Sequence, residues 1–278
     1  MGNGGKTALV LSAGGMFGAW QAGVWQALQR EFRPDIVVGA SVGSLNAWLI
    51  ACGCTGGELI DRWLSLDGLA QVRWRVPPYL SDGVIDAAPL EVIIREMCDA
   101  GTPRAEVGVV ATEFRTMRPR LFRYPEMSWR HVAASCAVPF FLPHYSIDGA
   151  YYTDGGLVEP LPVWAAMEMG ATRIVALNIL SSRPPLVRGL VGALRRYGKF
   201  ASPNTAAVSL VEIVPGETLG NAWDSIYWTS TKAERWIRLG RTDGENALAS
   251  VVECVNRGRL DGEPEESDEG CSHTVFTV

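Results

Sequence analysis

The chain has 278 residues, 47% of them hydrophobic, and its 25 Lys and Arg against 30 Asp and Glu give a formal net charge of −5. This length and apolar content are enough to bury a large core, and alternating strand and helix patterns predict one α/β domain. Because six of the acidic residues lie within 261–269, the rest of the chain is nearly neutral, which gives no support to nucleic-acid binding.

In the N-terminal half, buried strands alternate with helices. A continuous apolar run predicts a strand over 7–12, and the glycine-rich turn 13–18 leads from it into a helix that ends near Gln29. The elements expected next are a strand at 36–40, helices at 41–52, 57–67 and 88–100, a strand at 106–113, a hairpin-like segment at 121–124 and a helix at 129–136. Residues 67–86, with two consecutive prolines, are expected to be mostly loop.

The C-terminal half continues the alternation. The expected elements are strands at 145–148 and 151–153, a helix at 163–169, strands at 173–180 and 210–214, and helices at 225–239 and 244–256. The folded domain is therefore expected over 7–258, and the acidic residues 259–278 are expected to form a flexible tail.

A serine stands on a tight turn between a predicted strand and a predicted helix. The run Gly39-Ala40-Ser41-Val42-Gly43 follows the apolar segment 35–38 and precedes a helical pattern. Glycines two residues either side of such a serine are needed because neighbouring backbone crowds there and a Cβ would clash. The run is typical of a nucleophile elbow, and the alternative is a glycine-rich turn without a catalytic role.

A second glycine-rich turn follows the first predicted strand. Gly14 and Gly15 lie just before a helix, where backbone N–H groups can face a developing negative charge, and Gly18 completes the turn. We expect the amides of Gly14 and Gly15 to form an oxyanion hole. A dinucleotide-binding turn is the alternative, although the first glycine of G-x-G-x-x-G is missing.

A serine nucleophile needs a base, and a carboxylate is the best candidate for it. Asp154 lies between a strand end and the glycines Gly155 and Gly156, where a side chain can point into a site while the backbone turns sharply. A turn-initiating Asp without a catalytic role is the alternative. None of the three histidines has the late, loop-borne setting of a Ser-His-Asp triad: His131, His144 and His273.

Taken together, these motifs resemble the patatin-like phospholipase family over residues 7–258. The resemblance is carried by the glycine turn, the serine elbow and the run Asp154-Gly155-Gly156-Leu157-Val158-Glu159-Pro160-Leu161-Pro162. Two further segments are similar to the family's pattern, Ala134-Ser135-Cys136-Ala137-Val138-Pro139 and Ala111-Thr112-Glu113.

The resemblance implies a modified α/β-hydrolase architecture, three layers in α/β/α order with a mostly parallel central sheet. It also implies a Ser41-Asp154 dyad that cleaves lipid acyl esters as a phospholipase A or lysophospholipase does. Asp154 would accept the Ser41 proton, Ser41 would form an acyl-enzyme, and the amides of Gly14 and Gly15 would hold the oxyanion. Neither a metal nor another cofactor is implied.

The chain departs from the family pattern in its glycine turn. Where relatives commonly carry Asp-Gly-Gly-Gly and an Arg, this chain has Ser12-Ala13-Gly14-Gly15 and Phe17, and Glu159 stands where relatives often carry Asn. Loss of the Arg removes a positive charge, which favours neutral esters over phosphate headgroups. Two other functions stay open: a carboxylesterase or thioesterase with a histidine base, and a patatin-fold binding protein with weak catalysis.

Membrane contact is expected only from the folded surface. No apolar run reaches the eighteen residues of a membrane helix and the start lacks a secretory signal, so we expect a cytoplasmic protein with peripheral contact to a membrane. Trp74, between Arg73 and Arg75, and the amphipathic segment 186–200 are candidates for that contact, against ordinary packing in the fold. The six cysteines lack a C-x-x-C spacing, which favours reduced thiols over zinc or disulfides.

Overall fold

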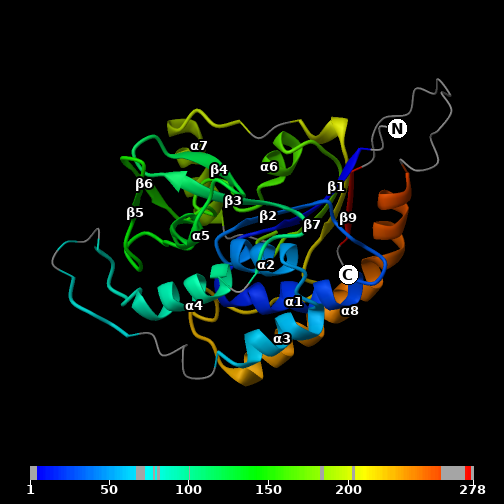
Figure 1. Cartoon of the computed structure of the whole chain (residues 1–278), viewed down its shortest axis with the longest axis horizontal. Helices are drawn as coiled ribbons and strands as arrows, with labels where there is room; N and C mark the ends of the chain where they lie inside the picture. The colour runs from blue at the N-terminus through cyan, green and yellow to red at the C-terminus, as the bar shows by residue number, and fades with distance from the viewer. Residues whose placement is uncertain are drawn as a thin grey trace.

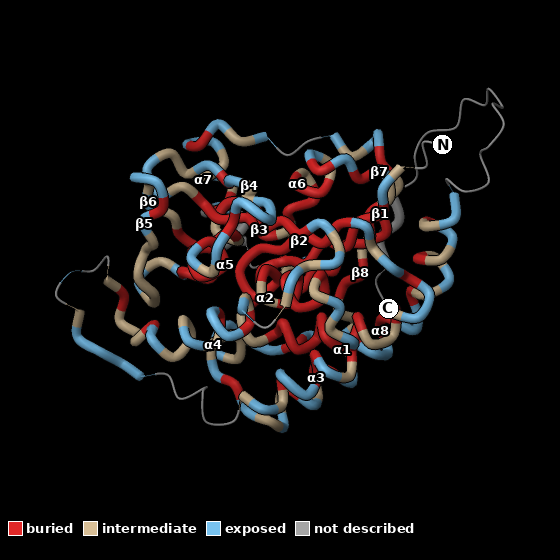
Figure 2. The backbone as a smooth tube through the Cα atoms, in the orientation of Figure 1, coloured by how far each residue is buried: buried red, intermediate tan, exposed pale blue. Residues whose placement is uncertain are grey.

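A computed structural model describes most of the chain. The described residues are 5–66, 73–77, 79, 82–99, 101–181, 185–201, 204–257 and 273–276, with the backbone alone described at 185–188, 190 and 273–276. Figure 1 shows a central sheet with helices on both faces, and the strands run through the buried interior (Figure 2). The predicted three-layer α/β fold is confirmed.

The sheet is mostly parallel, with an antiparallel part at one side. Its order is β5-β6-β3-β2-β1-β7-β8-β9, and β4 pairs with β3 outside this path. The five pairs from β3 through β2, β1, β7 and β8 to β9 are parallel, and the pairs of β3 with β4 and β6 and of β5 with β6 are antiparallel. The strands are β1 Lys6–Leu11, β2 Ile36–Ala40, β3 Glu106–Glu113, β4 Arg118–Arg123, β5 Tyr145–Ile147, β6 Ala150–Thr153, β7 Ala171–Leu177, β8 Ser209–Ile213 and β9 His273–Phe276.

Helices bury apolar side chains against both faces of this sheet. One core cluster joins the sheet to α1, α2, α3 and α8, and a second joins its other face to α6. The helices are η1 Gly15–Phe17, α1 Gly18–Leu28, α2 Val42–Ala51, α3 Gly56–Leu64, α4 Ala88–Asp99, α5 Trp129–Ser135, α6 Val163–Glu168, α7 Pro185–Tyr197, η3 Thr205–Ala207 and α8 Ser230–Asn256. In the described part of the chain, none of them is both long and apolar enough to span a bilayer.

The prediction of two C-terminal helices is wrong, because 230–256 form the single helix α8. Gly240 and Gly244, which punctuate the pattern in sequence, lie against α1, where a Cβ on Gly240 would collide with the Trp20 carbonyl oxygen. The Trp20 indole Nε1 donates a buried hydrogen bond of 2.7 Å to Asp243 Oδ2 in the same contact. These glycines therefore permit close helix packing and do not end the helix.

The C-terminal edge of the sheet includes part of the expected acidic tail. His273–Phe276 form β9, which pairs in parallel with β8, so Leu210 lies opposite His273 and Ile213 opposite Phe276. These four residues therefore belong to the sheet, while 258–272 lie outside the described residues.

Candidate functional site

Two strands meet end to end along β3, and the site lies where they meet. Parallel β2 ends with Ala40 opposite Val110, whereas antiparallel β6 ends with Thr153 opposite Thr112. The next residue of each strand is one of the predicted site residues, Ser41 and Asp154. Because the two strands approach each other from opposite directions, the sheet register itself brings these residues together beside the carboxyl end of β3.

Ser41 has a strained backbone conformation. Its φ of 54° and ψ of −130° lie outside the regions that non-glycine residues ordinarily adopt, and it is buried at the start of α2. The flanking glycines allow this turn, since a Cβ on Gly39 would collide with the Gly43 carbonyl oxygen and a Cβ on Gly43 with the Leu11 carbonyl oxygen. The strained turn packs directly on the end of β1.

Ser135 ties the serine turn to the rest of the site. The Ser41 N–H donates a hydrogen bond of 2.9 Å to Ser135 Oγ, and the Ser135 hydroxyl donates one of 2.6 Å to the Val110 carbonyl oxygen. The Ser135 carbonyl oxygen accepts the Gly155 N–H at 3.0 Å. One fully buried residue therefore links the serine turn, β3 and the aspartate turn.

The sequence pattern gave no sign of this role for Ser135. It lies at the end of α5, within a segment singled out only by resemblance, and its position depends on how α5 packs on β3. A buried small polar residue beside a turn was the only available signal, and many core serines share it.

Asp154 is a buried carboxyl that interacts with the Ser41 hydroxyl and the Gly156 N–H. Burial raises the pKa of Asp154 to about 6, against a smaller lowering by the Ser41 hydroxyl and the Gly156 N–H. Oδ1 accepts the Gly156 N–H at 2.8 Å, and no described residue gives Oδ2 a hydrogen bond of ordinary geometry. Its backbone is fixed as well, because the carbonyl oxygen accepts the Thr112 hydroxyl at 2.8 Å.

The predicted oxyanion turn lies against the aspartate turn. A Cβ on Gly156 would collide with the Cβ of Ala13, and a Cβ on Gly14 would lie 2.7 Å from Ile179 Cγ2. Gly15 has a φ of 58°, and a Cβ there would collide with the Ser225 carbonyl oxygen. Within the described residues, the amides of Gly14 and Gly15 donate no hydrogen bond.

The two remaining motif positions of the glycine turn are structural. A Cβ on Gly18 would lie 2.5 Å from Val42 Cγ2, so this glycine lets α1 approach the serine helix α2. Phe17 is buried and packs edge to face on Trp236 of α8, with ring centroids 5.1 Å apart. The aromatic residue at the family's Arg position therefore anchors the turn on α8.

Glu159 has a clear partner. Both of its carboxylate oxygens accept hydrogen bonds from Arg195 Nη2 at 2.7 Å, and Arg195 Nε donates to the Val158 carbonyl oxygen at 3.0 Å. This contact joins α7 to the segment that follows Asp154. Arg195 is therefore held by the protein, although the sequence pattern grouped it with the basic residues of a candidate membrane helix.

The described histidine side chains do not face the serine. His131 accepts the Ser128 N–H at 2.9 Å as part of the cap of α5, and it stacks on Phe122. His144 packs against Phe114 with its ring tilted by 41°, and burial lowers the pKa of both imidazoles. Neither forms a hydrogen bond with Ser41 or Asp154 in the described structure. The side chain of His273 lies outside the described residues.

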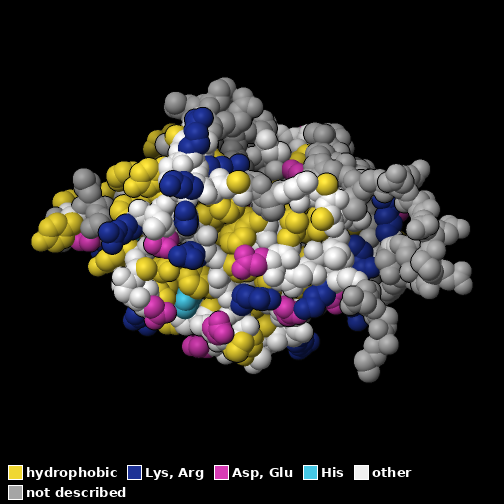
Figure 3. All heavy atoms as spheres, turned by 90° about the horizontal axis from the view of Figure 1, so that it is seen from above, with side chains coloured by type: hydrophobic (Ala, Val, Ile, Leu, Met, Phe, Trp, Pro, Cys, Tyr) yellow, Lys and Arg dark blue, Asp and Glu magenta, His cyan; other side chains and the backbone are white. Residues whose placement is uncertain are grey.

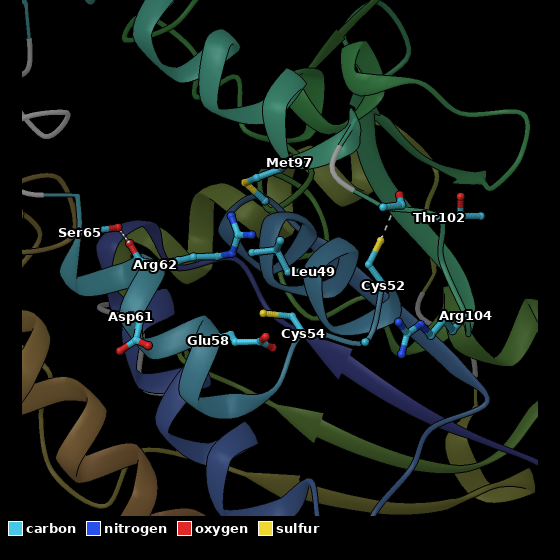
Figure 4. A pocket seen from close by; sticks show the side chains of 12 residues that line it. Leu49, Cys52, Cys54, Glu58, Asp61, Arg62, Ser65, Met97, Thr102 and Arg104 are labelled. Atoms are coloured by element: carbon cyan, nitrogen blue, oxygen red, sulfur yellow. Dashed lines mark hydrogen bonds between the residues drawn. The ribbon is translucent and has the colours of Figure 1, made fainter.

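A separate cavity of about 630 Å³ lies at the other end of α2 (Figure 4). It is lined by Cys52 and Cys54, by Arg62 and Arg104, and by Met97 among others. The ten-residue helix α2 separates it from Ser41 by about 15 Å. In Figure 4 the two thiols point apart, one toward Thr102 and the other toward Arg62. The cavity is therefore not part of the Ser41 site.

Comparison with known proteins agrees with the motifs. The profile of the family described as patatin-like phospholipase matches residues 9–167. The chain is 27% identical over 198 residues to the uncharacterized protein YjjU of Escherichia coli, covering 64% of this chain and 53% of YjjU. It is 26% identical over 220 residues to Lysophospholipase NTE1 of Candida glabrata, covering 74% of this chain and 13% of that protein.

Among solved structures, VipD from Legionella pneumophila aligns with a TM-score of 0.49 at 14% identity, over 89% of this chain and 67% of VipD. The chain thus spans about half of YjjU and a small part of the fungal protein.

Proposed function

Because the chain belongs to the patatin-like phospholipase family, as the match over 9–167 shows, we propose that it is a serine acyl hydrolase acting on lipid acyl esters. The proposed class is a phospholipase A or lysophospholipase. The observation that carries the proposal is the end-to-end approach of β2 and β6 along β3, because Ser41 and Asp154 directly follow the two strand ends that meet. The similarity to a protein named lysophospholipase supports the substrate class.

The buried environment of Asp154 suits a base. A pKa near 6 leaves the carboxylate ionised at neutral pH yet more basic than an ordinary Asp. In the proposed reaction Oδ2 accepts the Ser41 proton as Oγ attacks the ester carbonyl carbon. The proton then passes to the leaving alkoxide, and the acyl group stays on Ser41. Water next attacks the acyl-enzyme, with Asp154 accepting its proton and returning it to Ser41 Oγ.

The proposed oxyanion donors are the amides of Gly14 and Gly15. Both are unused by the described residues, and both stand on a turn that contacts the aspartate turn through Ala13 and Gly156. Donors fixed by backbone need no reorganisation when charge develops on the carbonyl oxygen, which is why such groups contribute strongly to catalysis.

The proposal is tested by labelling and by hydrolysis. A fluorophosphonate probe should form an adduct on Ser41, and a panel of phospholipids, lysophospholipids, triglycerides and short esters should show which acyl esters turn over. Ser41→Ala and Asp154→Asn should each lower kcat by at least about 10³-fold while the chain stays folded by thermal unfolding. A folded wild-type protein that takes no label and hydrolyses none of the panel would instead favour a binding protein.

A further inference from the structure

Six exposed aromatic side chains lie on three segments that contact the segments of the proposed active site. We name them the aromatic rim: Phe114, Phe140, Tyr151, Tyr197, Trp223 and Tyr227, all of them more than 40% exposed. A single exposed aromatic residue is ordinary on a protein surface, whereas exposed apolar side chains gathered in one region mark an interaction surface. The segment of each residue is connected to the site through hydrogen bonds.

The first side of the rim continues β3. Phe114 follows the last residue of that strand, and its N–H donates to the Tyr151 carbonyl oxygen at 2.8 Å. The end of α7 contacts the turn between β3 and β4, since Arg118 Nε donates to the Gly198 carbonyl oxygen at 2.8 Å. Tyr197, which is 70% exposed, therefore lies near the carboxyl end of the strand that holds Asp154.

The second side is formed by Phe140. The Asp154 N–H donates to the Ala137 carbonyl oxygen at 2.9 Å, and Phe140 lies three residues further along that segment. Phe140 has a φ of 70°, which is an outlier for a bulky residue, and it is 68% exposed. A bulky residue with a strained backbone and a mostly exposed ring points to a function outside the fold.

The third side borders the oxyanion turn. The Met16 N–H donates to the Ser225 carbonyl oxygen at 2.9 Å, and Trp223 and Tyr227 lie two residues to either side of Ser225. Trp223 is 63% exposed. The glycine turn that carries the proposed oxyanion donors is thus held by a segment that displays two aromatic rings.

Unpaired positive charge accompanies the rim. Arg115 stands next to Phe114, and Arg196 and Lys199 flank Tyr197, all three exposed. No described acidic side chain forms an ion pair with any of them. Seen from above, basic and hydrophobic side chains lie together on the half of the molecule that carries β4 and α7 (Figure 3).

We propose that the aromatic rim is a docking surface for an anionic phospholipid bilayer, a proposal that rests on the proposed function of the site it surrounds. Phe, Tyr and Trp suit the headgroup region because their rings are apolar and two of the three carry a polar group. Arg115, Arg196 and Lys199 supply attraction to anionic lipid. Docking of these segments brings the part of the molecule that holds Ser41 and Asp154 to the source of ester substrate.

The charge component is tested with catalytically inert protein, so that vesicles stay intact. The Ser41→Ala variant should co-sediment with vesicles of phosphatidylcholine mixed with phosphatidylserine. It should co-sediment much less with vesicles of phosphatidylcholine alone. Adding Arg115→Glu and Arg196→Glu should weaken binding to the mixed vesicles by about tenfold or more. The matched control, Arg30→Glu with Arg238→Glu, reverses two exposed charges outside the rim and should change binding less than about twofold.

The aromatic component is tested with Phe140→Asn. Asn tolerates a positive φ, so the variant should unfold at the wild-type temperature or above it. Loss of the ring should still weaken vesicle binding by about tenfold. A merely structural role for Phe140 predicts the opposite pair of results, lower stability with unchanged binding.

Failure of the docking proposal can be told apart from failure of the proposed function. When Ser41 is kept, so that the protein is active, the rim variants should hydrolyse a soluble short-chain ester at the wild-type rate. The docking proposal is wrong if the inert protein does not bind the mixed vesicles, or if the Arg115→Glu, Arg196→Glu variant binds them as well as its control does. In either case, hydrolysis of a soluble ester would still support the proposed enzymatic activity. Absence of ester hydrolysis in the wild-type chain counts against the enzyme and leaves the vesicle measurement valid.

Discussion

The two ends of α2 make an instructive comparison. At its first turn Ser41 has a positive φ, is buried and donates its N–H to Ser135, beside a carboxyl whose pKa is raised by burial. Just beyond its last residue, Cys52 and Cys54 line the separate cavity, and burial raises the pKa of both thiols. The Cys52 thiol donates to the Gly101 carbonyl oxygen at 3.5 Å.

The difference between the two ends of α2 indicates which of them is the better candidate for an active site. The separate cavity is spacious, yet the raised pKa of its two thiols keeps them in the protonated form, which is unreactive, and the thiols point apart. The Ser41 end combines a strained serine backbone with a buried carboxyl, and both features cost stability. The unfavourable free energy of its strained and buried groups, rather than the size of a cavity, distinguishes the proposed active site.

The largest expected effect is that of Gly15→Ala. The new Cβ collides with the Ser225 carbonyl oxygen and displaces the turn that carries both proposed oxyanion donors, so kcat on a soluble ester should fall by about 10²–10³-fold. Gly149→Ala is the matched control, because Gly149 also has a positive φ, 81°, but nothing lies within 4 Å of its Cβ position. Equal losses in the two variants would show that backbone strain alone is responsible.

The next effect is the acid limb of the pH profile. Because Asp154 must be ionised to accept a proton and its pKa is raised to about 6, kcat/KM should be flat above that pH and fall about tenfold per unit below it. His131→Gln and His144→Gln should keep the same limb if Asp154 is the base. A limb that disappears in either histidine variant would favour the histidine-dependent esterase instead.

Ser135→Ala should have a smaller effect. It leaves the buried Ser41 N–H without its acceptor and frees the serine turn from β3, so kcat should fall by about tenfold with KM nearly unchanged. Thr7→Val is the control, since it removes a buried hydroxyl that donates to Asp35 Oδ2 at 2.9 Å near the amino end of the central strand β1. If both variants lose stability equally and kcat equally, Ser135 has only a structural role.

The sequence predicted the local elements and the residues at the strand ends, but not how the strands meet. Ser41 and Asp154 were recognised separately, and their contact depends on β6 replacing β2 beside β3, a register set by distant pairings. The continuity of α8 through Gly240 was missed because close packing on α1 overrides the usual meaning of glycine. Phe140 gave no signal, since a positive φ is invisible in a run of apolar letters.

The smallest expected effect is at the other end of α2, where Cys52→Ser with Cys54→Ser should change kcat/KM on a soluble ester by less than about twofold. The helix separates both residues from Ser41 by its full length, and neither thiol contacts a residue of the proposed site in the described structure. Ser has nearly the same shape, so the fold should survive, as thermal unfolding will check. A large loss of activity with an intact fold would mean that the two ends of α2 are coupled. The cavity at the far end of the helix would then influence the reactivity of Ser41.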